Sequence, residues 1–176
     1  MNQTFIQKTK WFWPWQDNLE EVWLGQMSQQ GLHLKQVRSM AHYDFIKGQP
    51  ESCTYRLDFQ DSLKRKNIDE YLRIFADAGW EHLGAKRGWQ YFRKAAKPGE
   101  EPEIFTDAES KIQKYNRYLA YLGVTYPAFL VLFVAVMKGW PVWLLWLNAA
   151  VLLLFSIYAV VFSVKISQRI KQLRML

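Results

Sequence analysis

The stretch IDEYLRIFADAGWEHLGAKRGWQYFRKA, residues 68–95, decides the fold because its hydrophobic pattern changes along its length. Its first part carries apolar residues three and four apart, which is typical of an amphipathic helix. Gly79 follows where that helix would end, since glycine readily adopts the left-handed conformation of a helix cap. Two apolar-rich segments then flank a turn near Arg87-Gly88, which predicts a pair of antiparallel strands.

Three residues of the same stretch, Gly79, Gly84 and Lys86, nearly match the G-x-x-x-x-G-K pattern of a phosphate-binding loop. Such a loop follows a strand and precedes a helix whose free N–H groups point at the anion. Here the predicted helix comes before Gly79, and Arg87 stands where the pattern requires serine or threonine. We therefore interpret these glycines as turn residues and expect no nucleotide site.

An internal repeat is suggested when the chain is shifted by 48 residues against itself. The shift places Trp23 on Tyr71 and Gly31 on Gly79, and it keeps the order of the predicted elements. Each half then reads strand, helix, strand, strand. Gly31 and Gly79 are the predicted structural caps of the two helices.

The predicted fold class is α+β, a duplicated βαββ antiparallel sheet of six strands with two helices on one face. The repeats span about residues 5–50 and 53–98. In the first copy, Asp17 and Glu20 are expected at the start of the helix. The apolar stripe of that helix is predicted to comprise Leu19, Val22, Trp23 and Met27.

Two runs without charge follow, residues 119–137 and 140–164. Each is long enough to cross a hydrocarbon core of roughly 30 Å, and neither has a polar face. We predict a two-helix transmembrane hairpin. The expected order is a cytosolic α+β domain at 1–98, an acidic linker and juxtamembrane helix at 99–118, the two spans, and a basic cytoplasmic tail at 165–176.

The net charge of +7 comes from the membrane-proximal part of the chain. Five of the 23 basic residues follow residue 118, which leaves 18 against 16 acidic residues before it. That balance argues against a nucleic-acid partner. Only Lys138 lies between the spans, so we expect a multi-pass protein of the cell membrane with both termini cytoplasmic.

Two residues within the spans are expected to shape them. Pro127 lies in the middle of the first span and is predicted to kink it. Asn148 lies about eight residues into the second, where an amide either pairs helices or marks a pathway. A pathway through two spans requires oligomers, so we favour helix pairing, with a second copy of the chain as a further partner.

No catalytic motif and no paired cysteine occurs in the sequence. The residues that bind zinc most readily are His33, His42, His82 and Cys53. No second histidine or cysteine lies two to five residues from any of them, so we expect neither a metal nor a cofactor. We therefore expect that the protein is not an enzyme. The disfavoured alternative is an enzyme that acts on lipid or a small ligand.

Candidate partner contacts come from two segments. Arg56 and Asp58 alternate with the apolar residues of one strand, and they are explained either by cross-strand pairing on a solvated face or by a partner. Trp11, Trp13 and Trp15 form the densest aromatic cluster, which serves either packing or binding. We treat these five residues as candidate partner contacts.

The chain resembles the bacterial family called domain of unknown function 2812 over roughly residues 5–118. The resemblance rests on the segments WFWPWQDNLEEVWLGQMSQQGLHL, YRLDFQ, YLRIFADAGWEHLG, GWQYFRK and EIFTDAESKIQKYNRYL. It implies the same layout, with two hydrophobic spans behind the domain, and it carries no catalytic residues. Members are often encoded beside PadR-type regulators, which implies a regulatory or envelope-response role. Gly31-Leu32 replaces the usual Gly-Trp of the family.

We therefore expect a membrane-anchored regulatory or sensing module whose cytosolic domain binds a protein or a small ligand. The alternative is an accessory subunit of a membrane complex or transporter, which would bind through its transmembrane hairpin. The lipid bilayer is an expected partner in both cases.

Overall fold

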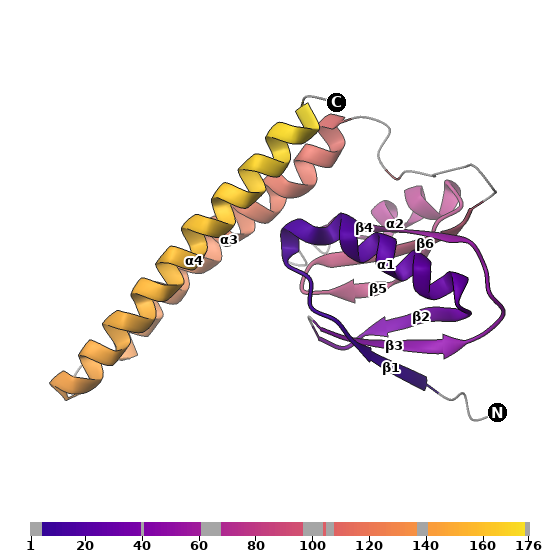
Figure 1. The fold of residues 1–176 in the computed structure, drawn as a ribbon. Helices are drawn as coiled ribbons and strands as arrows, with labels where there is room; N and C mark the ends of the chain where they lie inside the picture. The colour runs from indigo at the N-terminus through magenta and orange to yellow at the C-terminus, as the bar shows by residue number, and fades with distance from the viewer. Residues whose placement is uncertain are drawn as a thin grey trace. The chain divides into compact units, whose positions relative to one another are not determined.

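The computed structural model describes residues 5–39, 41–60, 68–96, 104, 108–136 and 141–174. The chain divides into two compact units, Met1–Thr106 and Asp107–Leu176. The first unit contains all the described strands and the second contains two long helices (Figure 1).

The first unit runs strand, helix, strand, strand, and then repeats this order. Its elements are β1 (Phe5–Thr9), the short 3-10 helix η1 (Pro14–Gln16), α1 (Asp17–Gln29), β2 (Leu32–Val37), β3 (His42–Lys47), β4 (Cys53–Phe59), α2 (Ile68–Asp77), β5 (Glu81–Lys86) and β6 (Trp89–Ala95). Each half has its third strand in the centre of a sheet. Duplication of a sequence unit stays a prediction.

The strands form two three-stranded antiparallel sheets, ordered β1-β3-β2 and β4-β6-β5. The α+β class with antiparallel sheets is confirmed, but the prediction of one six-stranded sheet is wrong. β2 and β5 adjoin, and both contain a register shift, between Leu34 and Gln36 and between His82 and Gly84. Such bulges increase the local twist of the two edge strands, which disfavours regular pairing of one edge with the other.

The two helices do not share one face of a sheet, which corrects the second part of the predicted fold. Tyr91 of β6 packs in a cluster with Trp23 of α1, whereas its neighbour Phe92 packs with Phe75 of α2. Successive strand residues point to opposite faces. The second sheet therefore lies between α1 and α2.

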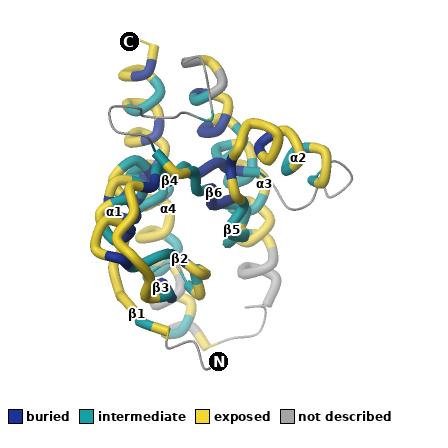
Figure 2. Tube along the Cα trace, turned by 90° about the vertical axis from the view of Figure 1, so that its right-hand side faces the viewer, coloured by how far each residue is buried: buried dark blue, intermediate teal, exposed yellow. Residues whose placement is uncertain are grey.

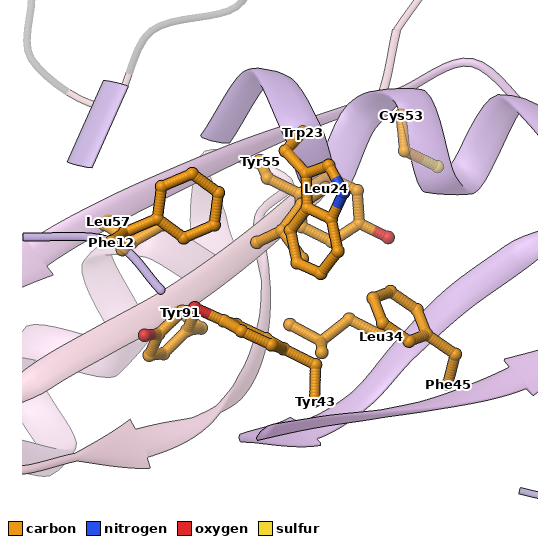
Figure 3. Packing of buried hydrophobic residues seen from close by; sticks show 10 residues of the cluster. All are labelled: Phe12, Trp23, Leu24, Leu34, Tyr43, Phe45, Cys53, Tyr55, Leu57 and Tyr91. Carbon is orange, nitrogen blue, oxygen red and sulfur yellow. The ribbon is translucent and has the colours of Figure 1, made fainter. Parts of the chain in front are cut away.

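The main core joins α1 to both sheets. Its buried residues are Phe12, Trp23, Leu24, Leu34, Tyr43, Phe45, Cys53, Tyr55, Leu57 and Tyr91 (Figure 3). Aromatic rings dominate, and the ring of Trp23 meets those of Tyr43 and Phe45 edge to face, at 4.9 Å and 5.7 Å between centroids. Burial is concentrated on the inner strands, whereas α2 is largely exposed (Figure 2).

The second unit consists of α3 (Ala108–Val136) and α4 (Val142–Arg174). They pair antiparallel, since Tyr118 contacts Phe162 while Phe129, further along α3, contacts Phe155, which precedes Phe162 in α4. Between these contacts, the hydroxyl groups of Tyr126 and Ser156 are hydrogen-bonded at 2.9 Å.

One helix of the described chain, over Leu144–Arg174, is long and apolar enough to cross a membrane. The sequence predicts two such spans, so the transmembrane hairpin is not confirmed. The described side chains of α3 end at Val131, short of the end of the predicted first span, and they include the charged Lys111, Lys114 and Arg117. α4 has no charge before Lys165.

Candidate functional site

A buried carboxylate joins α1 to both sheets. Glu20 lies on the inner face of α1, and the hydroxyls of Tyr43 and Tyr91 each donate a hydrogen bond of 2.9 Å to its Oε1. Tyr43 belongs to the central strand of the first sheet and Tyr91 to that of the second. One carboxylate oxygen therefore links the two sheets through their middle strands.

Burial shifts the acid–base behaviour of this cluster. It is the largest cause raising the pKa of Glu20 to about 7, while the two tyrosine hydroxyls oppose the shift and Asp17 adds to it. Burial and the adjacent carboxylate raise the pKa values of Tyr43 and Tyr91. Glu20 is therefore the group in this cluster that titrates near neutral pH.

A cleft of about 360 Å³ lies at the seam between β2 and β5. Leu34 and Val37 line it from β2, Leu83 and Ala85 line it from β5, and Tyr91 of β6 completes its lining. Tyr91 therefore connects the cleft to Glu20, because it lines the cleft while its hydroxyl donates a hydrogen bond to the carboxylate.

The cleft suits a small amphipathic molecule. Its leucine, valine and tyrosine side chains offer an apolar wall, and Lys35 and Gln36 of β2 add polar groups. The bordering Tyr91 hydroxyl is engaged with Glu20.

A second group of polar side chains, separate from the residues that line the cleft, comprises potential metal ligands. Ligand atoms of His33, Glu51 and Cys53 all lie within 4.8 Å of one another. Burial is the main cause raising the pKa of the Cys53 thiol, and Glu51 adds to the rise. Cys53 and Tyr91 occupy opposite ends of the cluster in Figure 3, so this group is separate from the cleft.

The spacing of histidine and cysteine along the chain does not reveal this second group. His33 lies in β2 and Cys53 begins β4, so they come from different sheets and are 20 residues apart. The expectation of no metal depends on ligand spacing of two to five residues. This criterion does not detect ligands that are distant in sequence and meet only in the tertiary structure. Glu51, two residues before Cys53, was the local signal, because an acidic side chain there is a ligand at short spacing.

The sequence pattern identifies Glu20 only as a residue at the start of a helix, not as a buried carboxylate. Asp17 and Glu20 do lie in the first turn of α1, as predicted, but the Glu20 side chain points into the core. The predicted apolar stripe is wrong at Leu19 and Val22, which are 50% and 59% exposed. Glu20 and Trp23 are three residues apart, and this spacing identifies the face of α1 that is buried.

Of the candidate contact residues in β4, Asp58 is fully buried and accepts a hydrogen bond of 2.9 Å from the Tyr71 hydroxyl of α2. It therefore does not lie on a solvated face, and that interpretation is corrected. Arg56 is half-buried and lies 3.6 Å from the Glu21 carboxylate of α1. Glu21 also accepts a hydrogen bond from the Leu57 N–H, so these charges tie α1 to the edge of its neighbouring sheet.

The tryptophan cluster forms a ladder of rings. Trp13 stacks on Trp15 with 5.2 Å between centroids, and Trp11 meets Trp13 edge to face at 5.5 Å. Phe12 lies between them in sequence and points into the core. Trp11 is 49% exposed. The ladder is compatible with both expectations, packing and binding.

Gly31 and Gly79 both follow a helix and have positive φ, +74° and +79°. They differ in their surroundings, since a Cβ on Gly31 would lie 2.5 Å from the Gly48 carbonyl oxygen, whereas one on Gly79 would meet only the Lys94 side chain at 3.6 Å. Gly84 and Lys86 lie in β5. The phosphate-loop spacing thus extends from a helix end into a strand.

In the second unit, α3 continues through Pro127, and the backbone of α4 includes Asn148, whose side chain lies outside the described part. A groove of about 540 Å³ between α3 and α4 is lined by Gly123, Pro127 and Phe155, among others. Large apolar side chains are exposed on both helices. They are Val124, Phe129, Val131, Leu145, Trp146, Leu153, Leu154, Phe155, Ile157, Val160, Val161 and Val164.

Comparison with known proteins gives one match. The family described as "Protein of unknown function (DUF2812)" matches residues 16–126, which cover α1, both sheets except β1, α2 and the first part of α3. No curated protein and no solved structure matches the chain.

Proposed function

The chain belongs to the DUF2812 family, which has no assigned function, and from its geometry we propose a membrane-anchored sensing module that binds a small amphipathic ligand at the β2–β5 seam. The observation that carries the proposal is the cleft of about 360 Å³ bordered by Tyr91, whose hydroxyl binds the buried Glu20. The module is a binding protein rather than an enzyme. Its regulatory role agrees with the one that the family resemblance implies.

The ligand acts through the junction of the two sheets. A molecule in the cleft contacts the Tyr91 ring, and any displacement of that ring changes the hydrogen bond to Glu20. Tyr43 shares the same carboxylate oxygen, so the change reaches the central strand of the other sheet. A ligand can shift this junction only as far as its affinities for the two arrangements differ.

Both long helices anchor the module, with α3 and α4 crossing the bilayer as a hairpin. The exposed apolar side chains on both helices support this, because such a surface is unfavourable in water. Basic residues support cytoplasmic termini, since several flank the outer ends of the hairpin and Lys138 alone lies between the spans. They are Lys111, Lys114, Arg117, Lys165, Arg169, Lys171 and Arg174.

A second candidate function is an accessory subunit of a membrane complex that binds through its helices. The groove of about 540 Å³ between α3 and α4 favours it, since Gly123 leaves room there for a neighbouring helix. Asn148→Leu separates the two functions. If the chain is a subunit, this variant should lose the membrane complex while ligand binding at the seam stays intact.

The proposal is tested with the full-length chain in detergent and a fragment library screened by ligand-observed NMR. Ala85→Trp places an indole in the cleft, and Ala78→Trp, an exposed position after α2, is its control. We expect saturable fragment binding in the wild type and the control, and its loss in Ala85→Trp. Equal binding to all three chains, or none to the folded wild type, contradicts the proposed site.

A further inference from the structure

Three potential metal ligands meet where the end of α1 lies beside the first residue of β4. They are the imidazole of His33, the carboxylate of Glu51 and the thiol of Cys53, all within 4.8 Å of one another. The group offers one nitrogen, one oxygen and one sulfur donor. Cys53 is buried and Glu51 is exposed, so the group reaches from the core to the solvent.

The backbone around this group is tightly tied. Ser28, at the end of α1, is fully buried, and its hydroxyl donates a hydrogen bond of 2.9 Å to the Glu51 carbonyl. The Glu51 N–H donates in return to the Ser28 carbonyl at 3.1 Å. This reciprocal pair fixes the segment that leads from Glu51 into β4.

The His33 ring is seated against glycine. A Cβ on Gly48 would lie 2.8 Å from His33 Cδ2, so any other residue at that position would displace the ring. The Gly48 N–H donates to the Gly31 carbonyl at 2.8 Å, which holds the turn against the end of α1. His33 therefore has a defined orientation before any ligand binds.

The hydrogen bonds of His33 leave one ring nitrogen suited to a metal. Its Nε2 lies 2.9 Å from the Gln49 carbonyl oxygen, an acceptor, so Nε2 carries the proton. Nδ1 then has a lone pair, and its neighbour Ser28 Oγ, at 3.5 Å, donates its single proton to the Glu51 carbonyl. A ring N–H donated to a backbone carbonyl is the arrangement that orients histidine ligands in metal proteins.

We propose that His33, Glu51 and Cys53 bind a zinc ion, with water as the fourth ligand. Mixed nitrogen, sulfur and oxygen donors suit zinc, whereas magnesium and calcium prefer oxygen alone. Tetrahedral zinc separates its ligand atoms by roughly 3.3 to 3.8 Å. Glu51 is exposed, so its carboxylate can move toward the other two ligand atoms when an ion binds.

The ion joins the two sheets at a second point. His33 lies in β2 of the first sheet and Cys53 in β4 of the second, so zinc adds a bond across a junction that hydrogen-bonded strands do not span. This site is independent of the proposed seam ligand, since it shares none of the residues lining the cleft.

The test uses the full-length chain purified without a histidine tag, stripped with a chelator and titrated with Co²⁺ in detergent. We expect one equivalent to give a thiolate-to-cobalt charge-transfer band with tetrahedral d–d absorption, and Zn²⁺ to displace it while Mg²⁺ does not. We also expect zinc to raise the melting temperature of the wild type.

Two variants and one control assign the ligands. Glu51 is exposed, so Glu51→Gln should keep the fold. Each of the two single variants, Glu51→Gln and His33→Gln, is expected to weaken Co²⁺ binding about tenfold or more. His42→Gln, an exposed histidine in β3, should bind as the wild type does. The proposal is overturned if the folded wild type gives no charge-transfer band, or if Glu51→Gln and His33→Gln bind as tightly as the control.

Discussion

Tyr91 and Glu20 are 71 residues apart in the chain and are joined by a hydrogen bond of 2.9 Å inside the core. The same carboxylate oxygen accepts a second bond from Tyr43. Because the two tyrosines stand on the central strands of different sheets, the charge of one buried side chain affects how the sheets are held together.

Stability should fall as pH rises across the titration of Glu20. Burial raises its pKa from 4.5 to about 7 in the folded chain. Between these values the folded chain keeps a proton that the unfolded chain has released, so deprotonation disfavours folding. The free energy of unfolding should decrease by about 3 kcal/mol over this window, measured by urea unfolding of the full-length chain in detergent with tryptophan fluorescence.

Glu20→Gln provides the control for that pH dependence. The amide oxygen still accepts from both tyrosines but does not titrate. We expect the decrease between about pH 4.5 and about pH 7 to disappear in this variant. A decrease of the same size in Glu20→Gln would show that other groups cause it.

Tyr91→Phe should cost about 1.5 to 3 kcal/mol at alkaline pH, because it removes a hydrogen bond from a buried charged acceptor. In a Glu20→Gln background the acceptor is neutral, and the cost should drop to about 0.5 to 1.5 kcal/mol. Urea unfolding of the four chains forms a double-mutant cycle. Equal costs in both backgrounds would mean that the contribution of the Tyr91 hydroxyl does not depend on the charge of Glu20.

The two helix-capping glycines should respond differently to alanine. Gly79→Ala is expected to cost about 1 to 2 kcal/mol, from positive φ alone. Gly31→Ala should cost more, since its Cβ would also lie 2.5 Å from a backbone oxygen of Gly48. Urea unfolding measures both variants, and equal losses would contradict the close approach at Gly31.

Cysteine labelling tests the proposed membrane topology. In a Cys53→Ser background, single cysteines are placed at Gln3, Gly139 and Leu176. An impermeant thiol reagent applied to intact cells should label the cysteine at 139 and should label the termini only after lysis. Labelling of either terminus in intact cells would overturn the cytoplasmic assignment.

The local elements could be predicted because their patterns need only near neighbours. Residues 68–95 give α2, Gly79, β5 and β6 in the predicted order, and Arg87 and Gly88 form the hairpin turn with positive φ. Two-residue turns of this kind match the twist of paired strands, so the hairpin follows from the local sequence.

The site could not be predicted in the same way because its partners are distant in sequence. Glu20 is buried since Tyr43 and Tyr91, 23 and 71 residues away, supply its hydrogen bonds. The division into two sheets depends on bulges at the seam, which strand alternation does not reveal. His33 and Cys53 likewise meet only after both sheets have formed.

The proposed link between the cleft and Glu20 can be tested through the pKa of the Glu20 carboxyl. A ¹³C titration of the glutamate-labelled full-length chain, with and without a fragment that saturates the cleft, measures that pKa. We expect a pKa of about 7 for Glu20 in the unbound chain, because the side chain is buried, and a different value when the cleft is occupied. A pKa at the ordinary 4.5, or one that occupancy leaves unchanged, would contradict it.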